Sequence, residues 1–210
     1  MAEITVVHLL RHGEVHNPDH VLYGRLPGYH LSANGQMMAA AAADYFDGRP
    51  VSAVFASPLE RAQETAQPVA TRLGLAITTD DRLIESVNVL EGKSVSLSSL
   101  AVNPANWRYL WNPIRPSWGE PYNGVVARVR QVIDRAREAS QGREAVCVSH
   151  QLPIWVSRLA AEHKRLWHNP STRECALGSV TSLTFDGDVL TDVSYAVPPR
   201  RQAADRDRAQ

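Results

Sequence analysis

Two histidines and two arginines stand just after short apolar runs of the chain. The side chains are Arg11, His12, Arg61 and His150, and the runs cover residues 4–10, 51–56 and 145–148. Imidazole and guanidinium groups are hydrogen-bond donors, and several of them together suit a tetrahedral oxyanion such as a phosphoryl group. If the fold brings the four side chains together, the sequence predicts a site for phosphoryl chemistry.

The elements that must position these side chains alternate between strand-like apolar runs and helical patterns. We predict strands at 4–10, 51–56, 75–79, 145–148, 179–185 and 189–195, and helices at 35–46, 58–73, 125–139 and 152–161. This alternation predicts an α/β fold, a three-layer α/β/α sandwich around a mostly parallel sheet. Ligands of such folds bind beyond the carboxyl ends of the strands, where the histidines and arginines stand.

The segment 91–123 breaks the alternation, because prolines and tryptophans interrupt its periodicity. We interpret it as an irregular lid insertion in a single domain that covers residues 1–197. Its tryptophans could form an aromatic lid, the insertion's own small core or a surface that binds a partner; they are Trp107, Trp111 and Trp118. The polar tail 198–210 is predicted to be disordered.

The composition excludes several classes of function. The 210 residues hold 22 basic and 22 acidic side chains, for a formal net charge of +0, so neither a nucleic acid nor a membrane surface is an expected partner. Only two cysteines are present, and no apolar run approaches the ~18 residues that a membrane span needs. With an acidic start and no basic leader, a cytoplasmic protein is predicted. The sequence makes no prediction of oligomeric state.

Five blocks of the sequence together resemble the histidine phosphatase superfamily, which includes the cofactor-dependent phosphoglycerate mutases. The blocks are residues 10–14, 17–24, 31–36, 57–66 and 148–150, and the resemblance extends to about residue 195. It implies that His12 is the nucleophile that becomes phosphohistidine, while Arg11, Arg61 and His150 hold the phosphoryl oxygens. A cationic clamp of this kind can stabilise the transition state without a metal or cofactor.

The resemblance also assigns a proton donor and substrate contacts. Residues 83–85 and 91–92 match the segment that carries the family's general acid, so Glu85 takes that role, with Glu91 as the alternative. The substrate-binding residues implied are Asn17, Tyr23, Gly24 and Gln151. The loop 17–24 is shifted by one residue relative to the family pattern, and Gln151 replaces a glycine of many relatives.

These roles make physical demands on the ionisable groups. His12 must attack as a neutral imidazole, and the charges of Arg11 and Arg61 should lower its pKa from the ordinary value of about 6.5. Glu85 must carry a proton before it protonates the leaving oxygen, which requires a raised pKa, as a closed pocket would give.

Hydrolysis is favoured over mutase activity. Phosphoglycerate mutases have a hydroxyl residue after the Arg-His-Gly-Glu block and arginine and tyrosine after the acid, whereas this chain has Val15 and residues 86–88, Ser-Val-Asn. The sequence therefore predicts a metal-independent phosphatase acting on a small phosphorylated metabolite. Arg108 and Arg115 in the lid could restore anion binding, so a phosphomutase stays open. A protein that binds a phospho-ligand or a partner on the same fold is a second alternative.

Metal binding is a competing hypothesis for the histidines. His12, His16 and His20 are spaced four apart, as zinc ligands on one helical face would be, but Gly13 and Pro18 argue against such a helix. A weaker pair is His163 with His168.

We predict that His8 and Cys147, inside apolar runs, are core residues.

Overall fold

The computed structural model describes residues 3–88, 91–92 and 119–199, and its centre is a six-stranded sheet. The strands are β1 (Ile4–Arg11), β2 (Val51–Ala56), β3 (Ile77–Thr79), β4 (Glu144–Ser149), β5 (Val180–Asp186) and β6 (Val189–Ala196). Their order is β3-β2-β4-β1-β5-β6. The pairs β3–β2, β2–β4 and β4–β1 are parallel, while β5 and β6 add an antiparallel hairpin at one edge.

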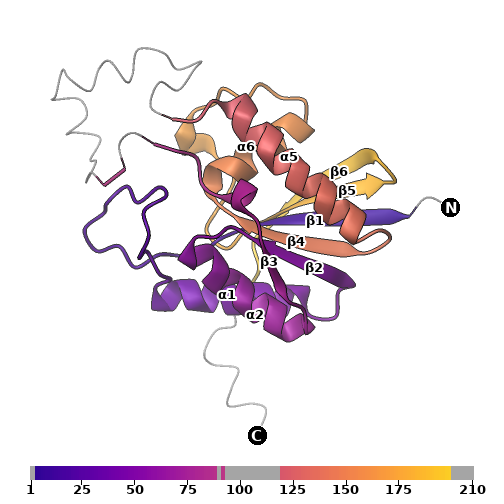
Figure 1. Ribbon diagram of the computed structural model, residues 1–210, viewed down its shortest axis with the longest axis horizontal. Coiled ribbons are helices and arrows are strands. Elements are labelled where there is room, and N and C mark those ends of the chain that lie inside the picture. The colour runs from indigo at the N-terminus through magenta and orange to yellow at the C-terminus, as the bar shows by residue number, and fades with distance from the viewer. Residues whose placement is uncertain (1–2, 89–90, 93–118, 200–210) are drawn as a thin grey trace, which may run out of the picture.

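Helices cover both faces of the sheet. The pair α1 (Ala33–Phe46) and α2 (Glu60–Leu73) packs on one face, and α5 (Tyr122–Ala139) with α6 (Gln151–Ala161) packs on the other (Figure 1). Two short 3₁₀ helices, η1 (Asp81–Leu83) and η3 (Pro170–Thr172), lie in the connections. The predicted α/β sandwich is therefore confirmed.

The central strands are buried from both sides, which explains their nearly continuous apolar sequence. In β1, Val7 and Leu9 belong to the core under α5 and α6, whereas Leu10 belongs to the core under α1 and α2. Burial of each such aliphatic side chain contributes about 1.5–3 kcal/mol. This packing fixes the end of β1, and with it the position of the residues that follow.

His8 is the one polar side chain near the centre of β1, and its hydrogen bonds confirm that it is a core residue. Its Nδ1 lies 2.8 Å from the Ser182 hydroxyl, and its Nε2 lies 2.9 Å from a carboxylate oxygen of Glu144. Burial opposes ionisation of Glu144, but hydrogen bonds from His8 and Arg49 hold its pKa at about 2.

Several element boundaries differ from the predicted ones. Helix α2 begins at Glu60, so the prediction that Pro58 stands in its first turn is wrong; Pro58 precedes the N-cap residue Leu59. Helix α5 begins at Tyr122, earlier than predicted, because Pro121 ends the preceding segment before the apolar periodicity starts at Val125. The terminal hairpin and β2 agree with the prediction.

Most of the predicted lid lies outside the described residues. Trp107, Trp111 and Trp118 belong to that part, as do Arg108 and Arg115, and so does the tail from residue 200. Within the described ranges, no helix has the length and apolar character that crossing a membrane requires.

Candidate active site

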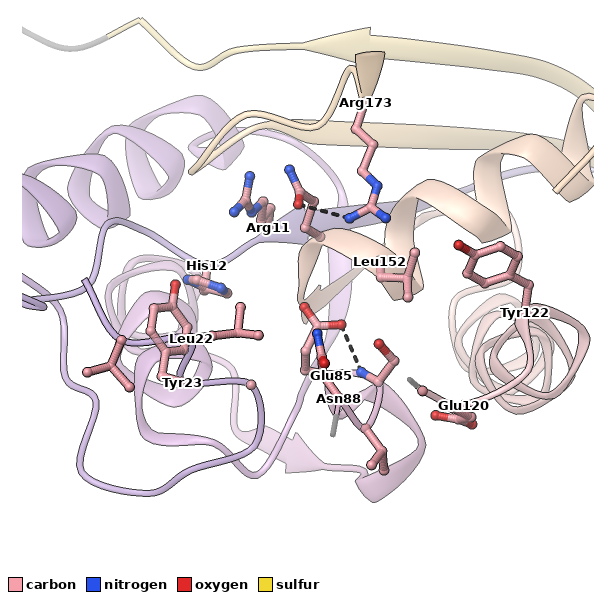
Figure 2. Close-up of a pocket in the computed structure, with 16 residues that line it drawn as sticks. Arg11, His12, Leu22, Tyr23, Glu85, Asn88, Glu120, Tyr122, Leu152 and Arg173 are labelled. Carbon is pink, nitrogen blue, oxygen red and sulfur yellow. Dashed lines mark hydrogen bonds between the residues drawn. The ribbon is translucent and has the colours of Figure 1, made fainter. Parts of the chain in front are cut away.

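The ends of three parallel strands meet at one edge of the sheet and position the histidines and arginines. Arg11 ends β1 and His12 follows it, His150 follows β4, and Arg61 lies in the first turn of α2 after β2. Arg11 and His12 line a cavity of about 280 Å³ (Figure 2). His150 and Arg61 are fully buried beside His12, and the centroids of the two imidazole rings are 5.1 Å apart.

His12 is held in one orientation by its own loop. Its Nδ1 lies 2.8 Å from the backbone oxygen of Gly13, and because a carbonyl only accepts, Nδ1 carries the proton. Burial lowers the pKa of His12 well below the ordinary 6.5, and the charges of Arg61 and Arg11 lower it further. The ring is therefore neutral, and Nε2 has a free lone pair, which is the form that a nucleophile needs.

A close approach between two glycines keeps the His12 loop in place. A Cβ atom at Gly13 would lie 2.6 Å from the backbone oxygen of Gly35, at the start of α1, and one at Gly35 would lie 2.0 Å from the backbone oxygen of Glu14. The Gly13 N–H also donates to the Thr65 hydroxyl at 3.0 Å. Any side chain at either glycine would push the loop away from α1.

Arg61 and Arg11 have buried N–H groups that no protein atom of the described chain accepts. Arg61 donates from Nη2 to the Gly24 backbone oxygen at 2.6 Å and lies over the Tyr23 ring, but its Nε and Nη1 have no partner there. Arg11 donates from Nη1 to the Cys175 backbone oxygen at 2.6 Å, and its Nε has none. Leaving such groups unpaired costs about 1–3 kcal/mol each, so an anionic ligand would be stabilised here.

His150 has one ring nitrogen fixed and one free. Its Nε2 lies 2.7 Å from the Ser57 hydroxyl, while its buried Nδ1 has no partner in the described part of the chain. Burial, followed by the neighbouring His12, Arg61 and Arg11, lowers the pKa of His150 well below 6.5. Next to these arginines, the second imidazole is therefore also neutral.

Of the two candidate proton donors, Glu85 faces the cavity. Burial raises the pKa of Glu85, although its hydrogen bond with the Ser86 N–H, 2.8 Å from Oε1, and nearby arginine charges oppose the rise. Glu91 instead accepts from the Asn88 N–H at 3.1 Å and lies against Gly24. The burial of Glu85 and its place in the cavity favour the protonated form of its carboxyl group.

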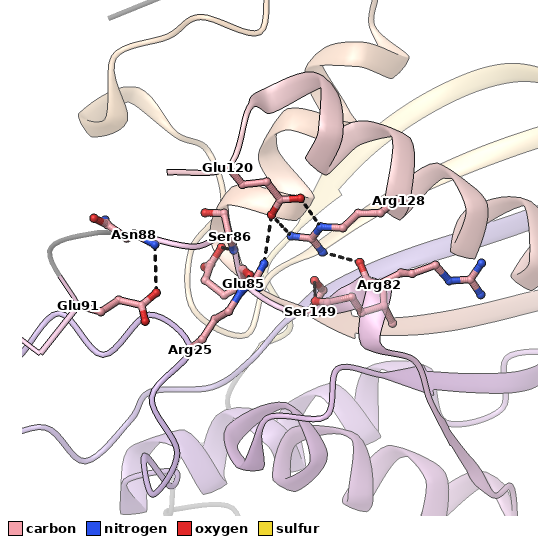
Figure 3. A network of polar contacts seen from close by, with 10 residues as sticks. Arg25, Arg82, Glu85, Ser86, Asn88, Glu91, Glu120, Arg128 and Ser149 are labelled. Atoms are coloured by element: carbon pink, nitrogen blue, oxygen red, sulfur yellow. Dashed lines mark hydrogen bonds and ion pairs between the residues drawn. The ribbon is translucent and has the colours of Figure 1, made fainter. Parts of the chain in front are cut away.

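The segment that carries Glu85 is tied to the rest of the fold by a network around Glu120 (Figure 3). The Glu120 carboxylate accepts from Arg25 at 3.1 Å and from Arg128 of α5 at 2.9 Å. Arg25 also donates to the backbone oxygen of Glu85 at 2.6 Å, and Arg128 donates to the backbone oxygen of Arg82. The Glu120 carboxylate therefore links two arginines that hold the Glu85 segment at two points, the backbone oxygens of Arg82 and Glu85.

The predicted substrate-binding residues divide into two groups. Tyr23, Gly24 and Gln151 line the cavity. Asn17 uses its side chain within its own loop: Oδ1 accepts from the Val21 N–H at 3.0 Å, and Nδ2 donates to the Val21 oxygen at 2.9 Å. Asn17 therefore shapes the loop that carries Tyr23 and Gly24.

Several cavity residues were not predicted from the sequence, and those with charged or hydroxyl groups include Glu120, Tyr122 and Arg173. Arg173 follows η3 in a connection without periodicity, and among so many arginines its position gives no signal. Tyr122 and Glu120 stand at the predicted boundary of the lid, where irregular sequence hides the start of α5.

The metal hypothesis finds no support in the described residues. No group of three or more histidine, cysteine or acidic side chains there is arranged to hold a metal ion. His12, His16 and His20 do not share a helix, because the described chain between β1 and α1 is loop. Cys147 is buried in β4, and burial raises the pKa of its thiol, as expected of a core residue.

Comparison with known proteins gives the class to which this fold and site belong. The sequence profile of the histidine phosphatase superfamily (branch 1) matches residues 7–197, so the chain belongs to that superfamily. It is 56% identical over 199 residues to the Mycobacterium tuberculosis protein Rv0525, a match that covers 94% of this chain and 98% of that protein.

Two solved structures share the fold. Bacillus stearothermophilus YhfR superimposes with a TM-score of 0.76 at 24% identity, covering 89% of this chain and 94% of that one. The mycobacterial glucosyl-3-phosphoglycerate phosphatase Rv2419c superimposes with a TM-score of 0.74, also at 24% identity, covering 92% and 98%. At this identity the likeness concerns the fold alone.

Proposed function

We propose that this protein is a phosphatase that hydrolyses a small phosphomonoester through a phosphohistidine intermediate on His12. The observation that carries the proposal is the state of His12: its Nδ1 proton is bound to the Gly13 oxygen, and its low pKa leaves Nε2 unprotonated among buried arginines. A neutral imidazole with a fixed lone pair beside unpaired guanidinium N–H groups suits attack on a phosphoryl group.

In the first step, Nε2 of His12 attacks phosphorus and the bond from phosphorus to the ester oxygen breaks. Glu85 gives its proton to the departing oxygen, which leaves as an alcohol. Arg11, Arg61 and His150 bind the phosphoryl oxygens, and the unpartnered N–H groups of the two arginines supply donors for them. A loose phosphoryl transition state needs this positioning and charge stabilisation more than further covalent help.

In the second step, a water molecule attacks the phosphohistidine. Glu85, now a carboxylate, takes a proton from that water, the bond from phosphorus to Nε2 breaks, and inorganic phosphate leaves. The same carboxyl group thus acts as an acid and then as a base, as a raised pKa allows. No metal or cofactor enters either step.

Hydrolysis is proposed rather than phosphoryl transfer back to the substrate because of the residues beside the donor. Val15 and the segment Ser86, Val87 and Asn88 stand where phosphoglycerate mutases hold the substrate carboxylate with hydroxyl, arginine and tyrosine groups. The proposed substrate belongs to the broad class of small phosphorylated metabolites, which also includes the substrate in the name of the neighbour Rv2419c.

The proposal is tested by measuring phosphate release from a panel of phosphomonoesters, with a metal chelator present and a mutase-coupled assay run in parallel. We expect release by the wild-type protein and its loss in His12→Ala, with folding retained by circular dichroism. Isomerisation without release would replace the phosphatase with a phosphomutase. Unchanged release in His12→Ala would overturn the phosphohistidine mechanism, and no turnover of any substrate would favour a binding protein.

A further inference from the structure

Two arginines line the cavity, Arg11 and Arg173, and the proposed phosphoryl chemistry uses only Arg11 of this pair. Arg173 reaches the cavity from the connection after η3 and lies on the same side as Arg11, across from Glu85 in Figure 2. Arg61 and Arg11 lower the pKa of both His12 and Glu85, whereas Arg173 acts on Glu85 but is not among the charges that act on His12. Arg173 therefore faces the proposed proton donor from the opposite wall of the cavity, on the side where the leaving group of the ester would lie.

The guanidinium of Arg173 is held by neutral partners. Its Nε donates to Nε2 of His168 at 2.8 Å, and its Nη1 donates to the side-chain oxygen of Gln151 at 3.3 Å. No carboxylate of the described chain lies within ion-pair distance of it, whereas Glu120 on the same cavity wall has two arginine partners. Burial also lowers the pKa of Arg173, so its charge lacks both full hydration and a counter-ion.

The position of Arg173 is built into the fold rather than left to a free side chain. Nδ1 of His168 lies 2.7 Å from the Leu166 backbone oxygen, so Nδ1 carries the proton and Nε2 accepts from Arg173. The His168 ring packs against Tyr122 of α5 and Trp155 of α6, with ring centroids 5.6 and 5.9 Å away. Two helices therefore orient the arginine through one histidine.

We propose that Arg173 binds a second anionic group, a carboxylate or a further phosphate, on the leaving-group side of the substrate. This inference rests on the proposed phosphatase function and narrows its substrate class to phosphomonoesters with two anionic groups. The planar guanidinium fork matches a carboxylate or phosphate in two hydrogen bonds, and partial desolvation strengthens each of them. Gln151 then acts as a positioning residue, because it orients the fork through its side-chain oxygen.

The test compares pairs of substrates that differ in the second anionic group. The first pair is 3-phosphoglycerate and glycerol 3-phosphate, and the second is fructose 1,6-bisphosphate and fructose 6-phosphate. We expect the wild-type protein to favour the doubly anionic member of at least one pair in kcat/KM. A preference in the first pair would identify the second anionic group as a carboxylate, and a preference in the second pair would identify it as a phosphate. In Arg173→Gln, that preference should fall by about 10- to 100-fold, mainly through KM.

A matched control separates recognition from a structural effect. Arg165 lies in the same connection and is exposed, so Arg165→Gln should keep the substrate preference. Arg173→Lys, which keeps the charge but loses the fork, should recover part of it. A preference that survives in Arg173→Gln, or a wild-type protein without preference in either pair, would overturn the inference.

Binding to an inactive protein distinguishes failure of this inference from failure of the proposed function. Calorimetry of His12→Asn with the same four compounds needs no turnover. We expect tighter binding of the doubly anionic member, lost when Arg173→Gln is added and kept when Arg165→Gln is added. If the wild-type protein hydrolyses nothing but this pattern appears, the phosphatase proposal fails and the anion site stands. If hydrolysis occurs without the pattern, only the anion site fails.

Discussion

The two ends of the cavity are built in different ways. At the phosphoryl end, Arg11 and His12 lie at the end of β1, and His150 follows β4 of the same sheet. Arg61 lies in the first turn of α2, the helix that follows β2. At the leaving-group end, Glu85, Glu120 and Arg173 all come from connections between the regular elements. The first set is positioned by backbone pairing, the second by side-chain hydrogen bonds among segments distant in the sequence.

Because of this difference, we expect the phosphoryl end to determine phosphoryl transfer itself and the leaving-group end to determine how its rate varies among substrates. Backbone pairing in the sheet leaves little freedom to the strand ends, so the groups that would transfer a phosphoryl group are fixed by the fold itself. The leaving-group end depends on bonds such as those of Glu120 with Arg25 and Arg128, which another sequence could replace without disturbing the sheet. We therefore expect substitutions at the phosphoryl end to affect all substrates, and those at the other end to affect some more than others.

The largest effect is expected at His12. His12→Asn removes the proposed nucleophile and should lower kcat by at least about 1,000-fold for every substrate, whatever its leaving group. His16→Asn, which changes an exposed histidine of the same loop, is the matched control and should retain activity. Loss of activity for only some substrates would contradict the distinction between the two ends of the cavity, because His12 would then contribute to substrate selectivity.

Glu85 should give a smaller loss that depends on the leaving group. Glu85→Gln removes the proposed proton donor and should slow hydrolysis of alkyl phosphates by about 100- to 10,000-fold. The loss should be much smaller for p-nitrophenyl phosphate, whose leaving group departs without a proton. Glu91→Gln, measured in parallel, tests the other candidate donor. A stronger leaving-group dependence in Glu91→Gln would transfer the role to Glu91.

Glu120 is expected to act as a positioning residue with a smaller effect. Glu120→Gln weakens the contacts with Arg25 and Arg128 and loosens the Glu85 segment, so kcat on alkyl phosphates should fall about 10-fold. Hydrolysis of p-nitrophenyl phosphate should change less. The control is Glu162→Gln, which breaks ion pairs with Arg158 and Lys164 at the end of α6. Equal losses on both substrates, with a lower melting temperature, would show a purely structural role.

The pH dependence of kcat/KM should show the ionisation of His12 and that of Glu85 as two separate limbs. The proposed mechanism requires neutral His12, whose pKa is lowered by burial and by the arginines, so activity should fall only well below pH 6.5 on the acid side. The proposed mechanism also requires protonated Glu85, whose pKa is raised by burial, so activity on alkyl phosphates should fall on the alkaline side. Glu85→Gln should remove the alkaline limb and keep the acid limb. Loss of the acid limb in that variant would contradict the assignment.

The sequence predicts the sheet and the phosphoryl end for the same physical reason. Buried parallel strands have an apolar pattern that is visible without a structure, and their carboxyl ends meet at one edge, so residues after β1 and β4 are expected to be neighbours. Arg61 is predicted to be their neighbour for the same reason, because it lies shortly after β2. Here the register of the strands determines which side chains are neighbours, so a pattern of two or three residues after each strand is enough to predict the site.

The other end of the cavity could not be predicted in this way. Arg173 reaches the cavity because His168 packs between Tyr122 and Trp155, and those contacts join α5, α6 and an irregular connection. The start of α5 was placed too late, so Tyr122 and Glu120 were assigned to the lid. Asn17 was expected at the substrate because of the family resemblance, whereas its side chain is hydrogen-bonded to the backbone of Val21. Such contacts depend on tertiary packing and leave no periodic signal.

The most direct test of the account is to trap the intermediate at the phosphoryl end. The protein is mixed with p-nitrophenyl phosphate, quenched in alkali during turnover and digested for mass spectrometry. Our account predicts one phosphoryl group on His12, stable in alkali and lost in acid, present also in His16→Asn and absent in His12→Asn. Turnover without this adduct, or a phosphoryl group on another residue, would contradict the account.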